Sequence, residues 1–171
     1  MLSMLPVVLA PARIGGVHSS PDEQGFARVV VFLDYQNVYM GACETFGSRH
    51  ASSRFGQVDP LALGKLIVAR HPDSTRLHGV RVYRGRPDPQ RDPRAYAANM
   101  RQSRAQERRG GGVVTVVSRS LRYPKEWPRV PVEEKGIDVS LAVDLVAMAA
   151  TEELDVAVVM STDTDYNVGA P

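Results

Sequence analysis

The chain has 171 residues, of which 43% are hydrophobic and 23% charged, a composition typical of one globular domain. No stretch approaches the roughly 20 apolar residues that a membrane-spanning helix needs, so we expect no membrane partner. Cys43 is the only cysteine. This excludes a disulfide framework and a cysteine-built zinc site, and it favours the reducing cytoplasm.

The net charge of +2 conceals a strong asymmetry along the chain. Residues 81–129 carry 13 basic and 4 acidic side chains, net +9, whereas residues 130–171 carry 1 basic and 9 acidic side chains, net −8. One segment therefore suits a polyanion, of which nucleic acid is the commonest, and the other suits cations.

The two ends of the chain differ from its middle. Residues 1–25 contain an apolar run broken by Pro6 and a stretch rich in Gly, Ser and acids, which predicts a disordered leader. The domain is then expected over residues 26–171. Few residues follow the last expected strand, whereas open α/β domains usually continue, so we expect the domain to lack its last helix and strand.

The predicted elements alternate between strands and helices. Residues 28–34, Arg-Val-Val-Val-Phe-Leu-Asp, form an apolar run typical of a parallel strand buried on both faces. Asp59 and Pro60 are typical of a helix N-cap and first helical residue. Further strands are expected at 79–83, 113–117 and 155–160, and helices at 38–46, 60–71, 93–109 and 136–150. This order predicts a three-layer α/β/α sandwich with a parallel sheet.

Acidic side chains occur where the first and last of these strands end. Asp34 ends the first strand, Asp163 and Asp165 follow the last, and Asp138 begins the helix before it. Ligands of open parallel sheets bind at the carboxyl ends of the strands. Four converging carboxylates would raise one another's pKa values, and a bound Mg²⁺ or Mn²⁺ relieves that repulsion. Such a cation can activate water and stabilise charge on a phosphodiester.

Each of these residues also has a simpler interpretation. An Asp at a strand end is often a turn residue or a helix cap, and Asp138 suits the first turn of any helix. Asn37 could hold a carboxylate or a phosphate oxygen, or cap a helix. Asp144 is either a group that supports the metal ligands or a salt-bridge partner in the core. Ser161 could hydrogen-bond a metal ligand or serve in a turn.

Three motifs in this order resemble the NYN domain, a branch of the PIN-like nucleases. They are the strand ending in Asp34-Tyr-Gln-Asn37, the turn Glu134-Lys-Gly-Ile-Asp138 with Asp144 behind it, and Ser161-Thr-Asp163-Thr-Asp165-Tyr166. The resemblance implies a PIN-like fold and a Mg²⁺- or Mn²⁺-dependent RNA endonuclease. It also implies that Asp34, Asp138, Asp163 and Asp165 hold the metal, with Asn37 beside them.

The basic segment suggests how RNA would be held. Arg94, Arg101, Arg104 and Arg108 fall on one stripe of the expected helix. Arginine suits bidentate phosphate contacts, and aromatic residues such as Trp127 can stack on unpaired bases, which favours single-stranded RNA. Alternatively, the stripe is an ordinary solvated helix face, and Trp127 anchors its loop on the core.

Two classes of function follow. The first is a metal-dependent endoribonuclease, and the second is a catalytically impaired module of the same fold that binds RNA or a protein. A haloacid-type phosphatase would want an acid where Gln36 stands, so that class is disfavoured. The sequence leaves open whether the protein forms a homodimer or binds a protein partner.

Overall fold

The structure is a computed structural model that describes residues 7–9, 25–46, 56–70 and 74–161. Strands and helices alternate along most of this part of the chain. In order, the elements are β1 (Val7–Leu9), β2 (Ala27–Asp34), α1 (Tyr35–Phe46), α2 (Pro60–Val68), β3 (Thr75–Arg86), α3 (Pro93–Gly110), β4 (Val114–Ser120), α4 (Ile137–Ala150) and β5 (Val156–Met160).

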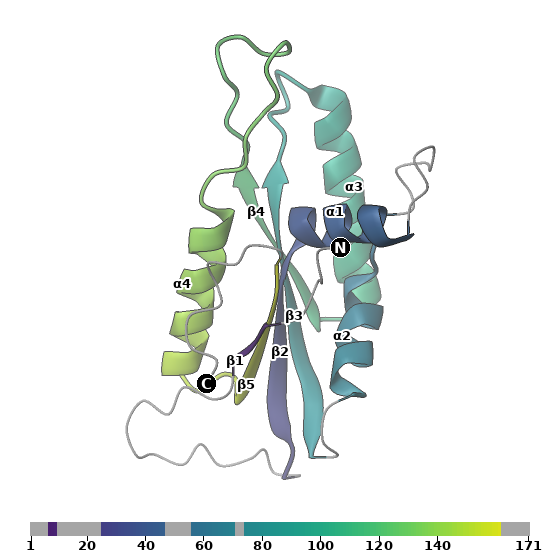
Figure 1. The fold of residues 1–171 in the computed structure, drawn as a ribbon, viewed down its shortest axis with the longest axis vertical. Coiled ribbons are helices and arrows are strands. Elements are labelled where there is room, and N and C mark those ends of the chain that lie inside the picture. Colours follow the sequence, from purple (N-terminus) through teal and green to yellow (C-terminus); the bar gives the residue numbers. More distant parts are fainter. Residues whose placement is uncertain (1–6, 10–24, 47–55, 71–73, 162–171) are drawn as a thin grey trace.

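The strands form one sheet in the order β1-β5-β2-β3-β4 (Figure 1). β5, β2, β3 and β4 are parallel to their neighbours, and β1 pairs antiparallel with β5 at the edge. Leu33 pairs with Met160 and Asp34 with Tyr83. The carboxyl ends of β2 and β5 therefore lie side by side, as the acidic site requires.

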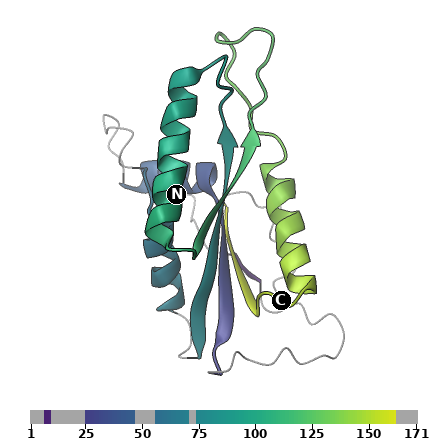
Figure 2. The same ribbon diagram turned by 180° about the vertical axis from the view of Figure 1, so that it is seen from behind.

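Helices cover both faces of this sheet. Figures 1 and 2 show α4 on one face and α1, α2 and α3 on the other. Val29, Val31 and Leu33 of β2 pack on the α2 side, while Val30 and Phe32 pack on the α4 side. All five are fully buried. This explains why the run is continuously apolar, and it confirms the predicted α/β/α sandwich with a parallel core.

The helix ends follow the local sequence. Asp59 and Asp92 cap α2 and α3 by accepting bonds from Ala62 N at 3.1 Å and Ala95 N at 3.0 Å, with a proline next in each case. Gly111, with φ of 55°, ends α3 in the left-handed conformation that glycine adopts without strain. None of the described helices combines the length and apolar character needed to cross a membrane.

Three elements differ from the expected ones. α1 begins at Tyr35, immediately after β2, and not at residue 38, because the Asp34 carboxylate accepts the Asn37 N–H and caps the first turn. β3 is longer than residues 79–83. Residues 7–9, expected within a disordered leader, form β1, whose pairing of Val8 with Val158 satisfies backbone groups along the edge of β5. The expected helix end at His71 lies outside the described residues.

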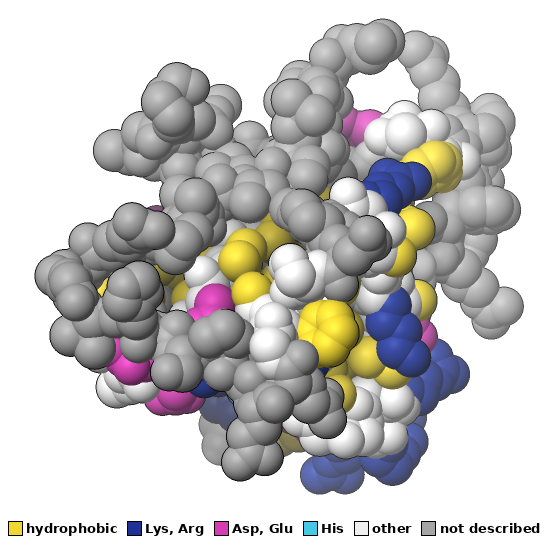
Figure 3. Space-filling model, turned by 90° about the horizontal axis from the view of Figure 1, so that it is seen from below, with side chains coloured by type: hydrophobic (Ala, Val, Ile, Leu, Met, Phe, Trp, Pro, Cys, Tyr) yellow, Lys and Arg dark blue, Asp and Glu magenta, His cyan; other side chains and the backbone are white. Residues whose placement is uncertain are grey.

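The charge asymmetry of the sequence is also visible on the surface. Figure 3 looks at the end of the molecule where the parallel strands begin. Lys and Arg side chains gather mainly on the side of α2 and α3, and Asp and Glu mainly on the side of α4. At this end of the molecule, basic and acidic side chains therefore gather mainly on different sides.

We expect Leu141→Ala to destabilise the fold by about 2–5 kcal/mol, because it removes a fully buried side chain and leaves a cavity. Of the residues of α4, only Leu141 and Ile137 are buried, so the helix that carries Asp138 depends on them. Val143→Ala, at a side chain 60% exposed on the same helix, should change the unfolding free energy by less than about 0.5 kcal/mol. Urea unfolding measures both, and equal effects would contradict this account of how α4 is held.

Candidate metal centre

Asp34 lies at the carboxyl end of β2, buried between the sheet and the start of α1. Its Oδ1 accepts the backbone N–H of Asn37 at 3.2 Å, and its Oδ2 accepts the Asn37 side-chain amide at 2.9 Å. Burial raises the pKa of the Asp34 carboxyl, the bonds from Asn37 and from Gln36 N–H oppose that rise, and the charge of Asp138 adds to it. The cap interpretation therefore applies to Asp34, and the same bonds fix how its carboxylate faces the strand ends.

The Asn37 side chain also joins two strand ends. Its Nδ2 donates to Ser161 Oγ at 2.9 Å in addition to Asp34 Oδ2. Ser161 is buried immediately after β5. Asp163 and Asp165, two and four residues further along the chain, lie outside the described residues. Asn37 therefore links Asp34 to Ser161, from which the chain continues toward Asp163 and Asp165.

Glu134 is a further carboxylate beside Asp34, and sequence reasoning gave it no role. Its Oε1 accepts the Gly85 N–H at 2.6 Å. A Cβ at residue 85 would come within 2.5 Å of the same oxygen, so glycine is needed for this approach. Burial raises the pKa of Glu134, as does the charge of Asp34, while the Gly85 bond and Arg84 lower it. The only signal in the sequence was its place in the Glu-Lys-Gly-Ile-Asp turn.

Asp144 lies in a different environment. Its Oδ2 accepts Arg81 Nη2 at 2.8 Å and the Tyr83 hydroxyl at 2.9 Å. Tyr83 is fully buried and stacks with Phe32, with ring centroids 6.3 Å apart. Of the two interpretations of Asp144, these contacts favour the salt-bridge partner between α4 and the sheet.

The carboxylate oxygens near Asp34 are the type of ligand that binds a hard divalent cation. Asp34 pairs with no Lys or Arg among the described residues, and the nearby acids Asp138 and Glu134 make its charge more costly. Carboxylate oxygens of this kind are what Mg²⁺ and Mn²⁺ prefer. Within the described ranges, no three His, Cys, Asp or Glu side chains gather closely enough to hold a metal. Two of the predicted ligands, Asp163 and Asp165, lie outside those ranges.

The predicted arginine stripe faces solvent. Arg94, Arg101, Arg104 and Arg108 are all exposed on α3, whose opposite side buries Asn99, Ser103 and Gln106. The stripe is therefore accessible to a polyanion.

Trp127 belongs to the loop between β4 and α4. It packs edge-on against Tyr123 with centroids 5.3 Å apart. Asp88 N–H donates to the Tyr123 hydroxyl at 3.1 Å, and Arg91 lies over the Tyr123 ring. These contacts favour the interpretation of Trp127 as a loop anchor.

An α/β/α sandwich with an aspartate at the carboxyl end of its central parallel strand is one of the features of a PIN-like nuclease fold. The NYN domain matches residues 28–169, and the chain belongs to this family, which carries that fold. The predicted resemblance to this family is thereby confirmed. No curated protein and no solved structure matches the chain.

Removing the charge of Asp34 should stabilise the metal-free protein at neutral pH. Because the folded-state pKa of Asp34 lies above its ordinary value of 3.8, folding favours the protonated form. The stabilisation from that proton is full below the ordinary pKa and is lost as the pH rises through the raised pKa. In EDTA, we therefore expect urea unfolding to show Asp34→Asn more stable than wild type at pH 7, and the difference to shrink toward pH 4.

Glu152→Gln is the control for loss of one negative charge, because Glu152 is exposed at the far end of α4. It should not reproduce the pH-dependent gain. An Asp34→Asn protein that is less stable than wild type at pH 7, or a gap that widens in acid, would contradict the burial argument.

Proposed function

We propose that this chain is a divalent-metal-dependent endoribonuclease that hydrolyses single-stranded RNA at the carboxyl edge of its sheet. The observation that carries the proposal is the Asn37 amide, 2.9 Å from both Asp34 Oδ2 and Ser161 Oγ. It joins the end of β2 to the residue from which the chain continues to Asp163 and Asp165. Membership of the NYN family, with its PIN-like nuclease fold, supports the same conclusion. The single cysteine of this chain, Cys43, is consistent with action in the reducing cytoplasm.

Four aspartates, Asp34, Asp138, Asp163 and Asp165, would hold Mg²⁺ or Mn²⁺. When bound, the cation supplies activation of water and neutralisation of charge on the phosphodiester. Asn37 fixes the orientation of the Asp34 carboxylate, as groups behind metal ligands commonly do. Ser161 in turn holds the Asn37 amide. The role of these two residues is to hold a ligand in position without adding charge.

RNA would be held by the exposed arginines of α3. Phosphate contacts from arginine are bidentate and independent of base sequence, which suits a stripe that follows a backbone. The site itself is acidic and would repel phosphates in the absence of a cation. The basic and acidic surfaces therefore have separate tasks, one in binding the strand and the other in cleaving it.

Cleavage of a labelled single-stranded RNA tests the proposal. We expect cleavage in Mg²⁺ or Mn²⁺, none in EDTA, and loss of activity in Asp34→Asn. Asn37→Ala should lower the rate about 10–100-fold, because it frees the Asp34 carboxylate without removing it. Glu152→Gln should cleave as wild type does. RNA that is bound but never cut in either metal would overturn the nuclease and favour a non-catalytic RNA-binding module.

The arginine stripe makes a separate prediction about salt. If Arg101 and Arg104 each contact one phosphate, replacing both with alanine should make the slope of log affinity against log salt shallower by about 1.4. Fluorescence anisotropy in EDTA measures this without cleavage. Lys65→Ala/Arg70→Ala removes the same charge from exposed positions off the stripe and should leave the slope nearly unchanged. Equal effects from the two pairs would show that only net charge matters.

A further inference from the structure

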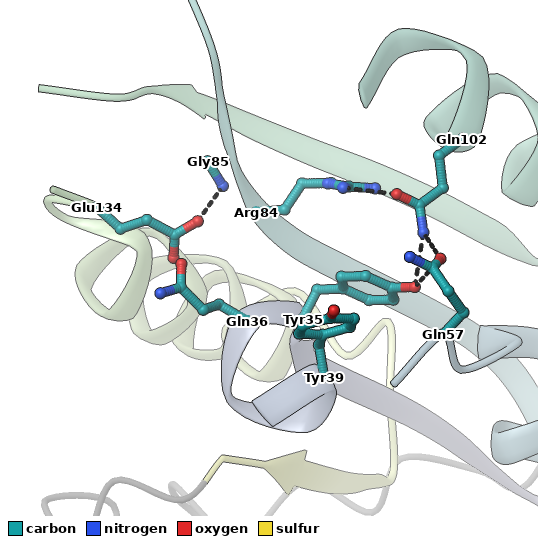
Figure 4. Close-up of a pocket in the computed structure, with 8 residues that line it drawn as sticks. All are labelled: Tyr35, Gln36, Tyr39, Gln57, Arg84, Gly85, Gln102 and Glu134. Atoms are coloured by element: carbon teal, nitrogen blue, oxygen red, sulfur yellow. Dashed lines mark hydrogen bonds between the residues drawn. The ribbon is translucent and has the colours of Figure 1, made fainter. Parts of the chain in front are cut away.

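A pocket opens beside Asp34, and none of the predicted metal ligands lines it. It encloses about 220 Å³ and is lined by two tyrosines, three glutamines, an arginine, a glutamate and a glycine (Figure 4). Tyr35 and Gln36 of its wall directly follow Asp34 in the chain. Pockets for drug-sized ligands are typically about 300–1,000 Å³, so this one suits a single flat ring system.

One wall of the pocket is built around the Arg84 guanidinium. It lies over the Tyr35 ring, 4.9 Å from the centroid, and its Nη2 donates to Gln102 Oε1 at 2.8 Å. Gln102 Nε2 donates in turn to the Tyr35 hydroxyl at 2.9 Å and to Gln57 Oε1. Arg84 Nε and Nη1 are buried without a hydrogen-bond partner in the described part of the chain. This wall therefore contains donor groups of Arg84 that are not satisfied by the described residues.

The opposite wall is acidic. Glu134 is held against Gly85 N–H, and Gln36 donates to both Glu134 oxygens, at 3.0 and 3.1 Å, when its amide nitrogen faces them. Figure 4 shows Glu134 and Gln36 at one end of the pocket and Gln102 and Gln57 at the other, with the Tyr35 and Tyr39 rings between the two ends.

The two charges across the pocket attract each other without direct contact. The pKa of Arg84 is lowered by burial, and the charge of Glu134 opposes that change. Among the described residues, Arg84 and Glu134 form neither an ion pair nor a hydrogen bond with each other. A ligand between them must therefore offer acceptors toward Arg84 and donors toward Glu134, and it must be flat enough to lie against a tyrosine.

We propose that this pocket binds one unpaired guanine base of the RNA strand beside the phosphodiester at Asp34, an assignment that rests on the proposed function. Guanine presents acceptors at O6 and N7, the usual partners of arginine, and adjacent N–H donors at N1 and N2 that a carboxylate can accept. Cytosine offers one amino donor and is the next best fit. Uracil has no amino group for Glu134, and adenine presents its amino group beside N7 where guanine has O6. Tyr39 supplies an aromatic face for the base.

The test separates base recognition from cleavage. Labelled oligouridine strands that carry a single central G, C, A or U are titrated in EDTA, and the same strands are then cut in Mg²⁺ or Mn²⁺ to map the scissile bond. We expect the G strand to bind at least about tenfold more tightly than the all-U strand, and cuts to cluster at the phosphodiester next to G. The order G, then C, then A and U should hold in binding.

Two substitutions test whether Glu134 is the residue that produces the preference for G. Glu134→Gln should reduce the advantage of G to less than threefold, and Glu133→Gln, its exposed neighbour, should keep it. If Glu134→Gln fails to fold by thermal unfolding, Tyr39→Leu and Tyr39→Phe give the answer. The first should lose G binding and the second should retain it.

The outcomes are distinguishable from failure of the nuclease proposal. Cutting without any preference for G overturns the pocket and leaves the nuclease standing. Binding that prefers G without cutting in either metal supports the pocket and overturns the nuclease. Competition by free guanosine monophosphate as effective as the G strand, mole for mole, would show that the ligand is a free nucleotide and would overturn the RNA assignment.

Discussion

The carboxylate of Asp34 is buried at the junction of β2, β5 and α1, and its two bonds from Asn37 tie the start of α1 to that junction. Burying a charge is costly unless hydrogen bonds or an opposite charge compensate for it. Here the Asn37 backbone caps α1 on Asp34, and the Asn37 amide reaches across to Ser161. The helix start and the strand junction therefore share contacts with the same side chain. The remaining cost of its charge is what a divalent cation would offset.

Much of this architecture could be predicted from the sequence because several local signals agree with the tertiary fold. Residues 29–33, between Arg28 and Asp34, are apolar at every position since helices cover both faces of β2. Asp59 and Asp92 mark helix starts because an N-cap depends on residues that are adjacent in the chain. The neighbouring positions of β2 and β5 were only a condition of the acidic-site hypothesis, and the register of Leu33 with Met160 fulfils it.

Other features depend on contacts between distant segments, which local patterns do not encode. β1 pairs with the edge of β5, and although Val7 and Val8 favour a strand, residues 7–9 alone do not identify β5 as the partner. Glu134 gains its environment from Gly85, which lies 49 positions away in the sequence. Asp144 could not be assigned from its helical position alone, because its partners Arg81 and Tyr83 belong to another element. Asp34, Asn37 and Ser161 are brought together, whereas the placement of Asp163 and Asp165 stays a prediction.

The first turn of α1 links the acidic edge to the neighbouring pocket. Successive residues of a helix point about 100° apart, so three consecutive side chains reach three different places. Tyr35 lies under Arg84, Gln36 faces Glu134, and Asn37 holds Asp34. Because these side chains project from one helical turn, the pocket and the group that orients Asp34 share one structural support. A base bound in the pocket would therefore lie against the same turn of α1 that positions Asp34, which places base recognition and the acidic edge next to each other.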